Sequence, residues 1–280
     1  MPLNFHIVDV FSDHAFLGNP VAVLLGADEL SAEQMMSITR WMNLSETAFI
    51  LEPDRAGADY RVRIFTLNRE LPFAGHPTLG SAAAWLSTRA NADDRRTLVQ
   101  SCEAGLIDLR RTSAGLAFAA PPLVRYEPAS VDERRDACQV LGISESDVLD
   151  AHWVDNGPGW LGIRLASAEA VLAVDANAAP GRQVDIGLVG PTAGSEDYDF
   201  EVRALFSDHH GNLIEDPVTG SLNAAVAHWL LDSGVASAPF RCGQGGRVGR
   251  RGRISVDAED GTLWIGGATQ LRVSGQIDPF

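Results

Sequence analysis

Two segments of the chain repeat one pattern, and this repeat limits the possible fold more than any other feature. In the first, an alternating strand at 59–66 leads to the step PFAG (72–75) and then to an alanine-rich helix. In the second, a strand at 198–206 leads to PVTG (217–220) and a similar helix. The two P-x-x-G steps lie 145 residues apart, about half of the chain. The repeat predicts two similar domains in tandem.

The helices that follow the two steps, at 78–89 and 222–232, are apolar on nearly all sides. A helix of this kind is surrounded by protein. The dipeptide Pro121-Pro122 is the best boundary signal between the two halves. We therefore predict an N-terminal domain at 1–118 and a C-terminal domain at 119–267, each built around one buried helix.

Charge and hydropathy narrow the choice of partner. The 280-residue chain has a formal net charge of −15 and no basic stripe, which disfavours nucleic acid and anionic membranes. No segment has the roughly 18 consecutive apolar residues that a membrane span needs, and the N-terminus lacks a secretory signal pattern. We expect a cytoplasmic protein whose partner is a small molecule.

The chain contains no lysine, so all 22 basic residues are arginine. This excludes a Schiff base to pyridoxal phosphate or to a carbonyl substrate, and it excludes a P-loop lysine. The three cysteines, Cys102, Cys138 and Cys242, are widely spaced and include no C-x-x-C pair, which argues against a disulfide framework and a zinc site. Carboxylates, imidazoles, hydroxyls, thiols and backbone dipoles remain for the chemistry.

Each P-x-x-G step opens a helix, and the first-turn N–H groups of a helix can bind an anion such as a carboxylate. Gly75 and Gly220 would let a ligand approach the backbone closely, and His76 and Ser221 follow them at equivalent positions. The alternative is that His76 and Ser221 only cap their helices.

Two carboxylates are candidates for catalysis. Asp216 precedes the second step, at the place that Glu70-Leu71 takes in the first repeat. It can be kept ionised by the helix dipole or bind a substrate amine or hydroxyl, and the alternative is a surface salt bridge. Glu46 has apolar neighbours, which would raise its pKa towards the range useful for proton transfer, and the alternative is a solvated turn.

Two further segments suggest other chemistry less strongly. The run SDHH (207–210) could suggest a metal site, but further ligands at suitable spacings are missing, which favours a polar loop. The run CGQGGRVGRRGR (242–253) is glycine-rich, but a strand-like stretch follows it instead of a helix. This favours a hairpin with arginines on its edge over a phosphate-binding loop.

Taken together, these motifs resemble the PhzF-type isomerases of phenazine biosynthesis, from the first strand to the last quarter of the chain. The pair ELPFAGHPT and EDPVTGS is highly specific for this family. The motifs that carry the resemblance are DVFSDHAFLGNPVAV (9–23), NLSETAF (43–49), RIFTLNRELPFAGHPTLG (63–80), EDPVTGS (215–221) and QGGRVGRRGRI (244–254).

The resemblance implies the α+β fold of diaminopimelate epimerase. In that fold, two pseudo-two-fold related domains each form a β-barrel-like sheet around a central helix, and the active site lies in the cleft between them. It also implies that the C-terminal strand, at about 268–280, returns to the first domain, and that the protein is a homodimer.

Carried over by motif, Glu46 is the acid/base that moves a proton. His76 and Asp216 are its catalytic partners, while Gly75, Gly220 and Ser221 bind the substrate. The type reaction isomerises trans-2,3-dihydro-3-hydroxyanthranilate by proton transfer, with no metal or organic cofactor. One carboxyl group can take and return the proton while the helix N-termini hold the substrate carboxylate.

Three loops depart from the family pattern, at 68–69, 208–210 and 251–252, so the exact substrate stays open. A non-catalytic member that binds a small ligand or another protein is one alternative, and an amino-acid racemase or epimerase that uses Glu46 and Asp216 is another. A two-thiol epimerase is disfavoured because no cysteine lies near either helix start.

Overall fold

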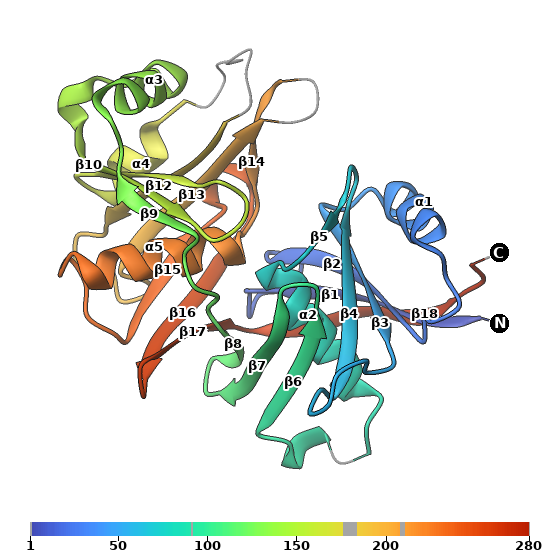
Figure 1. The fold of residues 1–280 in the computed structure, drawn as a ribbon. Coiled ribbons are helices and arrows are strands. Elements are labelled where there is room, and N and C mark those ends of the chain that lie inside the picture. Colours follow the sequence, from blue (N-terminus) through green and yellow to red (C-terminus); the bar gives the residue numbers. More distant parts are fainter. Residues whose placement is uncertain (1, 91, 176–183, 208–210, 280) are drawn as a thin grey trace. The chain divides into compact units, whose positions relative to one another are not determined.

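The computed structural model describes residues 2–90, 92–175, 184–207 and 211–279. By internal contacts the chain divides into two compact units. Unit 1 comprises Met1–Ala119 and Gly266–Phe280, and unit 2 comprises Ala120–Ile265 (Figure 1). A search of the described residues finds no helix that is long and apolar enough to cross a membrane.

Unit 1 consists of a mixed sheet, two α-helices and one short 3₁₀ turn. Its elements in chain order are β1 (Leu3–Val10), β2 (Asn19–Leu25), α1 (Ala32–Met42), β3 (Glu46–Leu51), β4 (Tyr60–Thr66), β5 (Glu70–Leu71), α2 (Gly75–Ser87), η1 (Ala92–Asp94), β6 (Thr97–Cys102), β7 (Gly105–Thr112), β8 (Gly115–Ala119) and β18 (Thr269–Ile277).

The strands of unit 1 surround helix α2, as Figure 1 shows. The sheet runs β18–β1–β2–β3–β4–β6–β7–β8, and β5 pairs with the end of β4. Helix α2 contacts strands β1, β2, β3, β4, β6, β8 and β18, and every residue from Gly75 to Leu86 is buried. The alanine-rich sequence explains this position, because small side chains let a helix lie close to strands on several sides.

Unit 2 has the same kinds of elements. They are β9 (Arg125–Pro128), α3 (Val131–Leu141), η2 (Glu145–Asp147), β10 (Val148–Asp155), β11 (Leu161–Leu165), α4 (Ala168–Ala173), β12 (Asp185–Pro191), β13 (Phe200–Ser207), β14 (Leu213–Asp216), α5 (Gly220–Asp232), β15 (Phe240–Gln244), η3 (Gly246–Val248), β16 (Gly252–Glu259) and β17 (Thr262–Gly267).

The strand pairing of unit 2 repeats that of unit 1. Strands β1 to β7 pair in the order antiparallel, parallel, antiparallel, antiparallel, with β4–β6 parallel and β6–β7 antiparallel. Strands β10 to β16 follow the same sequence of pairings, and α5 takes the place of α2. Both central helices have 13 residues. The sequence repeat therefore reflects a repeat of whole units.

The register of the strand pairing shows which residue of unit 1 corresponds to which residue of unit 2. Ile64 pairs with Leu71 in unit 1, and Ala204 pairs with Asp216 in unit 2. Likewise, Phe65 pairs with Glu70 and Leu205 pairs with Glu215. Leu71 is therefore the equivalent of Asp216, and Glu70 is the equivalent of Glu215.

Some elements have no counterpart among the predictions from the sequence. Strands β9, β10 and β12 were not predicted, and the segment 97–119 contains three strands. In helix α1, Met35 and Ile38 are buried, whereas the Trp41 indole is 77% exposed.

Candidate active site

Glu46 and His76 lie together in unit 1. Glu46 is the first residue of β3, and His76 is the second residue of α2. Glu46 Oε2 is 3.4 Å from His76 Nε2, and the side chains are 17% and 4% exposed. A carboxylate and an imidazole are thus paired in a largely water-free environment, where the interaction between them is strong.

Local backbone geometry explains how Glu46 comes to this position. Helix α1 ends at Asn43, which adopts a left-handed conformation (φ 54°) and donates its N–H to the Thr39 carbonyl oxygen at 3.1 Å. Asparagine tolerates this conformation better than most residues. The chain then enters β3 within three residues, and pairing of Glu46 with Thr66 of β4 fixes its register.

Burial raises the pKa of the Glu46 carboxyl to about 7, and a hydrogen bond with the Ser45 side chain acts in the opposite direction. A carboxyl with a pKa near neutrality exists in both protonation states under physiological conditions, as a group that both takes and returns a proton requires. The Glu46 side chain is 17% exposed, so it is largely but not completely removed from water, as its apolar sequence neighbours indicated.

The raised pKa of Glu46 predicts a change of stability with pH. Between pH 4.5 and about 7 the unfolded chain loses the Glu46 proton first, so the free energy of unfolding falls as pH rises through this range. The part of this decrease that comes from Glu46, on the order of 1–3 kcal/mol in the free energy of unfolding, should be absent in Glu46→Gln. Urea denaturation at pH 5 and pH 8 measures the difference.

Glu52→Gln is a matched control for this experiment, because Glu52 is exposed and lies just beyond the same strand. Burial also raises the pKa of Glu201 to about 7, so Glu201 adds its own pH dependence to the free energy of unfolding in this range. The contribution of Glu46 is therefore the difference between the wild type and Glu46→Gln. Equal pH dependence in wild type and Glu46→Gln would contradict the burial of an ionisable Glu46.

The start of α2 is suited to an anion. Ala74 precedes the helix without a side-chain cap, and Gly75 and His76 form its first two positions. Pro77 has no N–H, and the first N–H groups of a helix have no partner within the helix, so the Gly75 N–H is a donor at this helix start. Small or flat groups of a ligand can approach it because Gly75 has no side chain.

In unit 2, Asp216 ends β14 and Gly220 begins α5. Asp216 Oδ2 accepts a short hydrogen bond from the Thr219 hydroxyl. Gln244 Nε2 donates to the Asp216 carbonyl oxygen at 3.2 Å and to Thr219 Oγ1 at 3.0 Å. Asp216 is therefore held through both its side chain and its backbone.

Ser221, the second residue of α5, is held from another side. Trp160 Nε1 donates to Ser221 Oγ at 3.2 Å, and Asn156 Nδ2 donates to the Ser221 carbonyl oxygen at 2.8 Å. The indole is 4% exposed. Because Oγ accepts from Trp160, the hydroxyl hydrogen of Ser221 can be directed to another acceptor.

The predicted site residues thus form two clusters, one in each unit. Unit 1 holds Glu46, Gly75 and His76, and unit 2 holds Asp216, Gly220 and Ser221. Sequence reasoning missed Thr219, Gln244, Trp160 and Asn156. Thr219 lies inside the recognised step EDPVTGS and Gln244 begins the recognised run QGGRVGRRGRI, so their positions were usable signals. Trp160 and Asn156 lie 61 and 65 residues from Ser221 in the chain, so no local signal marks them.

Each unit also contains an arginine–glutamate pair beside its step. Arg63 donates to both oxygens of Glu70, at 2.7 and 2.6 Å. Arg203 donates through Nε and Nη2 to Glu215 Oε2, at 3.1 and 2.8 Å. Glu70 and Glu215 take equivalent positions in these ion pairs, so the residue of unit 1 that matches Asp216 is Leu71 alone and not Glu70-Leu71 together.

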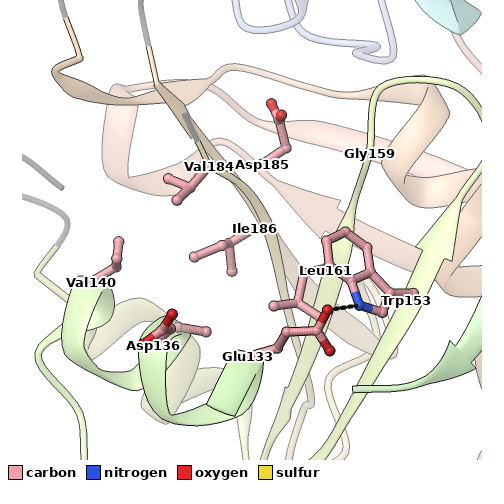
Figure 2. Close-up of a pocket in the computed structure, with 10 residues that line it drawn as sticks. Glu133, Asp136, Val140, Trp153, Gly159, Leu161, Val184, Asp185 and Ile186 are labelled. Atoms are coloured by element: carbon pink, nitrogen blue, oxygen red, sulfur yellow. Dashed lines mark hydrogen bonds between the residues drawn. The ribbon is translucent and has the colours of Figure 1, made fainter. Parts of the chain in front are cut away.

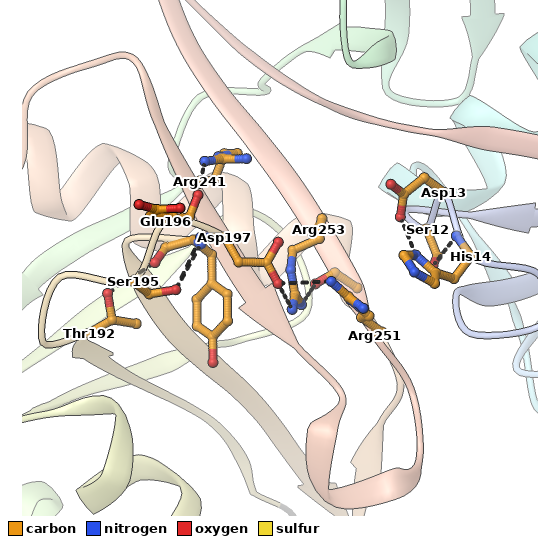
Figure 3. A network of polar contacts seen from close by, with 12 residues as sticks. Ser12, Asp13, His14, Thr192, Ser195, Glu196, Asp197, Arg241, Arg251 and Arg253 are labelled. Atoms are coloured by element: carbon orange, nitrogen blue, oxygen red, sulfur yellow. Dashed lines mark hydrogen bonds and ion pairs between the residues drawn. The ribbon is translucent and has the colours of Figure 1, made fainter.

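The glycine-rich run at 242–253 forms the predicted hairpin. Strand β15 pairs antiparallel with β16, and η3 lies in the turn. Figure 3 shows Arg251 and Arg253 directed to the carboxylate of Asp197, at 3.2 and 2.6 Å. These ion pairs support the prediction of a hairpin with arginines on its edge. The loop residues Asp208, His209 and His210 lie outside the described residues.

The cysteines do not take part in either cluster. Cys102, Cys138 and Cys242 are buried free thiols, and burial raises the pKa of each. A thiol with a raised pKa is a weak source of thiolate. Within the described part of the chain, no group of three or more histidine, cysteine, aspartate or glutamate side chains could hold a metal ion.

Unit 2 contains a separate cavity of about 350 Å³ between α3 and the sheet (Figure 2). It is lined by Glu133, Asp136, Ala137, Val140, Trp153, Gly159, Leu161, Val184, Asp185 and Ile186. Trp153 Nε1 donates to Glu133 Oε1 at 3.0 Å, and Glu133 Oε2 accepts from the Ser130 N–H at 2.8 Å. Glu133 therefore caps α3, and none of the predicted site residues lines this cavity.

Comparison with known proteins identifies the family of this chain. A family model described as phenazine biosynthesis-like protein matches residues 8–276. An uncharacterised isomerase of Pasteurella multocida is 33% identical over 95% of this chain and 91% of its own length. The trans-2,3-dihydro-3-hydroxyanthranilate isomerase of Pseudomonas fluorescens is 33% identical over 97% of this chain and 95% of its own length.

Among solved structures, a PhzF-family phenazine biosynthesis protein of Enterococcus faecalis has a TM-score of 0.79 and 25% identity, covering 99% of this chain and all of its own. The predicted α+β fold class is thereby confirmed. The chain therefore belongs to the phenazine biosynthesis-like family of PhzF-type proteins, and it is an isomerase.

Proposed function

We propose that Glu46 transfers a proton within a small cyclic or unsaturated substrate that carries a carboxylate, without a metal or an organic cofactor. The observation that carries this proposal is the burial of Glu46 beside His76, 3.4 Å away, with a carboxyl pKa of about 7. A group of that pKa is close to optimal for general acid–base catalysis near neutral pH.

The reaction is an isomerisation, so one proton leaves one atom of the substrate and one proton arrives at another. The Glu46 carboxylate takes the first proton, becomes neutral, and returns a proton at the second atom. No electrons are gained or lost overall. His76 faces the Glu46 carboxyl and orients it during both steps.

In unit 1, the start of α2 with the Gly75 N–H can bind a carboxylate and stabilise its negative charge. In unit 2, the start of α5 with the Gly220 N–H can do the same, and there Asp216 can accept a hydrogen bond from an amine or hydroxyl group and Ser221 can donate one. The relative from Pseudomonas fluorescens makes trans-2,3-dihydro-3-hydroxyanthranilate the first candidate substrate. It carries a carboxylate, an amine and a hydroxyl on a small unsaturated ring.

The test is incubation of the wild-type protein with this compound in deuterium oxide, followed by proton NMR and mass spectrometry. We expect conversion to the isomer, with deuterium at the carbon that receives the proton. Binding of the compound in calorimetry with neither conversion nor label uptake would instead favour a non-catalytic binding member.

Labelling experiments of the same kind, with amino acids and with cysteine variants, test two other mechanisms. Deuterium at the α-carbon of an amino acid, with inversion, would favour a racemase that uses Glu46 and Asp216. Loss of conversion in Cys102→Ser, Cys138→Ser or Cys242→Ser, with the fold intact by circular dichroism, would show that a thiol is required.

A further inference from the structure

The side chain of Gln244 uses all of its hydrogen-bonding capacity beside Asp216. Its Nε2 donates to the Asp216 carbonyl oxygen at 3.2 Å and to Thr219 Oγ1 at 3.0 Å. Its Oε1 accepts from the Thr219 N–H at 3.0 Å and from Asn223 Nδ2 at 2.7 Å. Gln244 is 2% exposed and Asn223 is fully buried. An amide has two donors and two acceptor sites, so all four positions are occupied.

Backbone groups fix the direction of this network. The Thr219 N–H can only donate, so the atom of Gln244 that faces it is the oxygen. The Asp216 carbonyl can only accept, so the atom that faces it is the nitrogen. The opposite orientation of the amide would bring donor against donor and acceptor against acceptor.

The orientation of the Gln244 amide also determines where the Thr219 hydroxyl hydrogen points relative to the Asp216 carboxylate. Because Gln244 Nε2 donates to Thr219 Oγ1, the hydroxyl hydrogen of Thr219 is directed to its remaining partner, Asp216 Oδ2. A hydrogen bond donated to a carboxylate stabilises its ionised form. Thr219 Oγ1 makes no capping hydrogen bond to the backbone of α5; the hydrogen bonds it makes are those with Gln244 and Asp216.

Unit 1 provides an internal comparison, because it has the same fold without this network. The positions equivalent to Asp216, Thr219, Asn223 and Gln244 hold Leu71, Ala74, Thr78 and Cys102. Unit 1 has a buried glutamine too, since Gln100 donates to Thr78 Oγ1 at 3.0 Å, but Leu71 and Ala74 supply neither a carboxylate nor a hydroxyl. The hydrogen bond from Thr219 to Asp216 in unit 2 therefore has no counterpart at these positions of unit 1.

We propose that Gln244 and Thr219 are positioning residues that hold Asp216 as an ionised hydrogen-bond acceptor, with Gln244 setting the direction of the Thr219 hydroxyl. This places two residues in the active site that act through Asp216 and not on the substrate. Their effect on turnover rests on the proposed function, whereas their effect on Asp216 does not.

The first test removes the hydroxyl. Thr219→Val has nearly the same shape but cannot donate to Asp216, and Thr219→Ser keeps the donor. We expect the NMR titration midpoint of the Asp216 carboxyl carbon, identified with Asp216→Asn, to rise by roughly one pH unit in Thr219→Val. It should stay at the wild-type value in Thr219→Ser.

The second test reverses the direction of the hydrogen bond between residue 244 and the Thr219 hydroxyl. Gln244→Glu is isosteric but places an acceptor where Nε2 donated, so the Thr219 hydroxyl turns towards residue 244 and the new charge repels Asp216. The Asp216 midpoint should rise further than in Thr219→Val. Gln100→Glu is the matched control, because Gln100 is a fully buried glutamine of unit 1 that donates to Thr78 Oγ1 at 3.0 Å.

The turnover readout is a second break in kcat/KM, below the Glu46 break near pH 7, where the slope steepens at the Asp216 midpoint. This second break should move to higher pH together with the Asp216 midpoint in both variants. An unchanged Asp216 midpoint in Thr219→Val and Gln244→Glu would overturn the inference. The titration needs no substrate, so it decides the inference even if the proposed reaction is not observed.

Discussion

Glu46→Gln is expected to lower the rate of isomerisation by about 10³-fold, because general acid–base catalysis by one side chain contributes 10²–10⁴. Glutamine keeps the size of the side chain and its position at the start of β3, but it cannot take up a proton. KM should change little, because the proposed function assigns binding of the substrate carboxylate to backbone groups at helix starts and not to Glu46. Stopped-flow or NMR kinetics at saturating substrate measures kcat directly.

The pH profile gives the same prediction a second test. A general base must be ionised in the free enzyme, so kcat/KM should increase tenfold per pH unit below the Glu46 pKa of about 7 and level off above it. Glu46→Asp should keep this shape at a lower rate. Glu52→Gln should match the wild type throughout. Full activity in Glu46→Gln would assign the proton transfer to another group.

Arg203→Met is expected to lower the free energy of unfolding by about 3–5 kcal/mol, as is typical when one partner of a buried ion pair is removed. The side chains of Arg203 and Glu215 are 2% and 6% exposed. Arg203 Nη1 also donates to the carbonyl oxygens of Val171 and Val174, at 2.9 and 2.7 Å. Methionine leaves the Glu215 carboxylate and both carbonyl oxygens without this donor.

The equivalent pair of unit 1 is the matched control. Arg63 and Glu70 are 21% and 31% exposed, so water can replace the missing guanidinium. Arg63→Met should therefore cost only about 1 kcal/mol. Urea denaturation of both variants, and of Arg203→Met combined with Glu215→Leu, measures the contrast. Equal losses in the two single variants would contradict the burial argument, and the double variant should recover part of the loss.

The parts of the fold that the sequence predicts are those with a strong local signal. The steps at 72–75 and 217–220 and the alanine-rich helices after them identify the repeat and place Glu46, His76, Asp216 and Ser221 near helix starts or strand ends. The first turn of a helix is encoded by neighbouring residues, so this information is present in a short stretch of sequence.

The missed elements depend on distant partners. All four residues of β9 are exposed, so no alternation of apolar residues marks it as a strand. Its pairing with β10, between Arg125 and Asp155 at one end, is what makes it one. Gln244 lies 25 residues from Thr219 in a glycine-rich stretch whose local signal is a turn. Only the pairing of β13 with β15 brings Gln244 beside Asp216.

The pairing of β1 with β18 has a consequence for the order of folding. Leu3 pairs with Ile277, so β1 obtains this neighbour only after the whole of unit 2 has been synthesised. Unit 2 is continuous from Ala120 to Ile265 and has all of its residues earlier. Domains generally fold as units during synthesis. On the ribosome, the second unit is thus expected to finish folding before the first, against the usual N-to-C order.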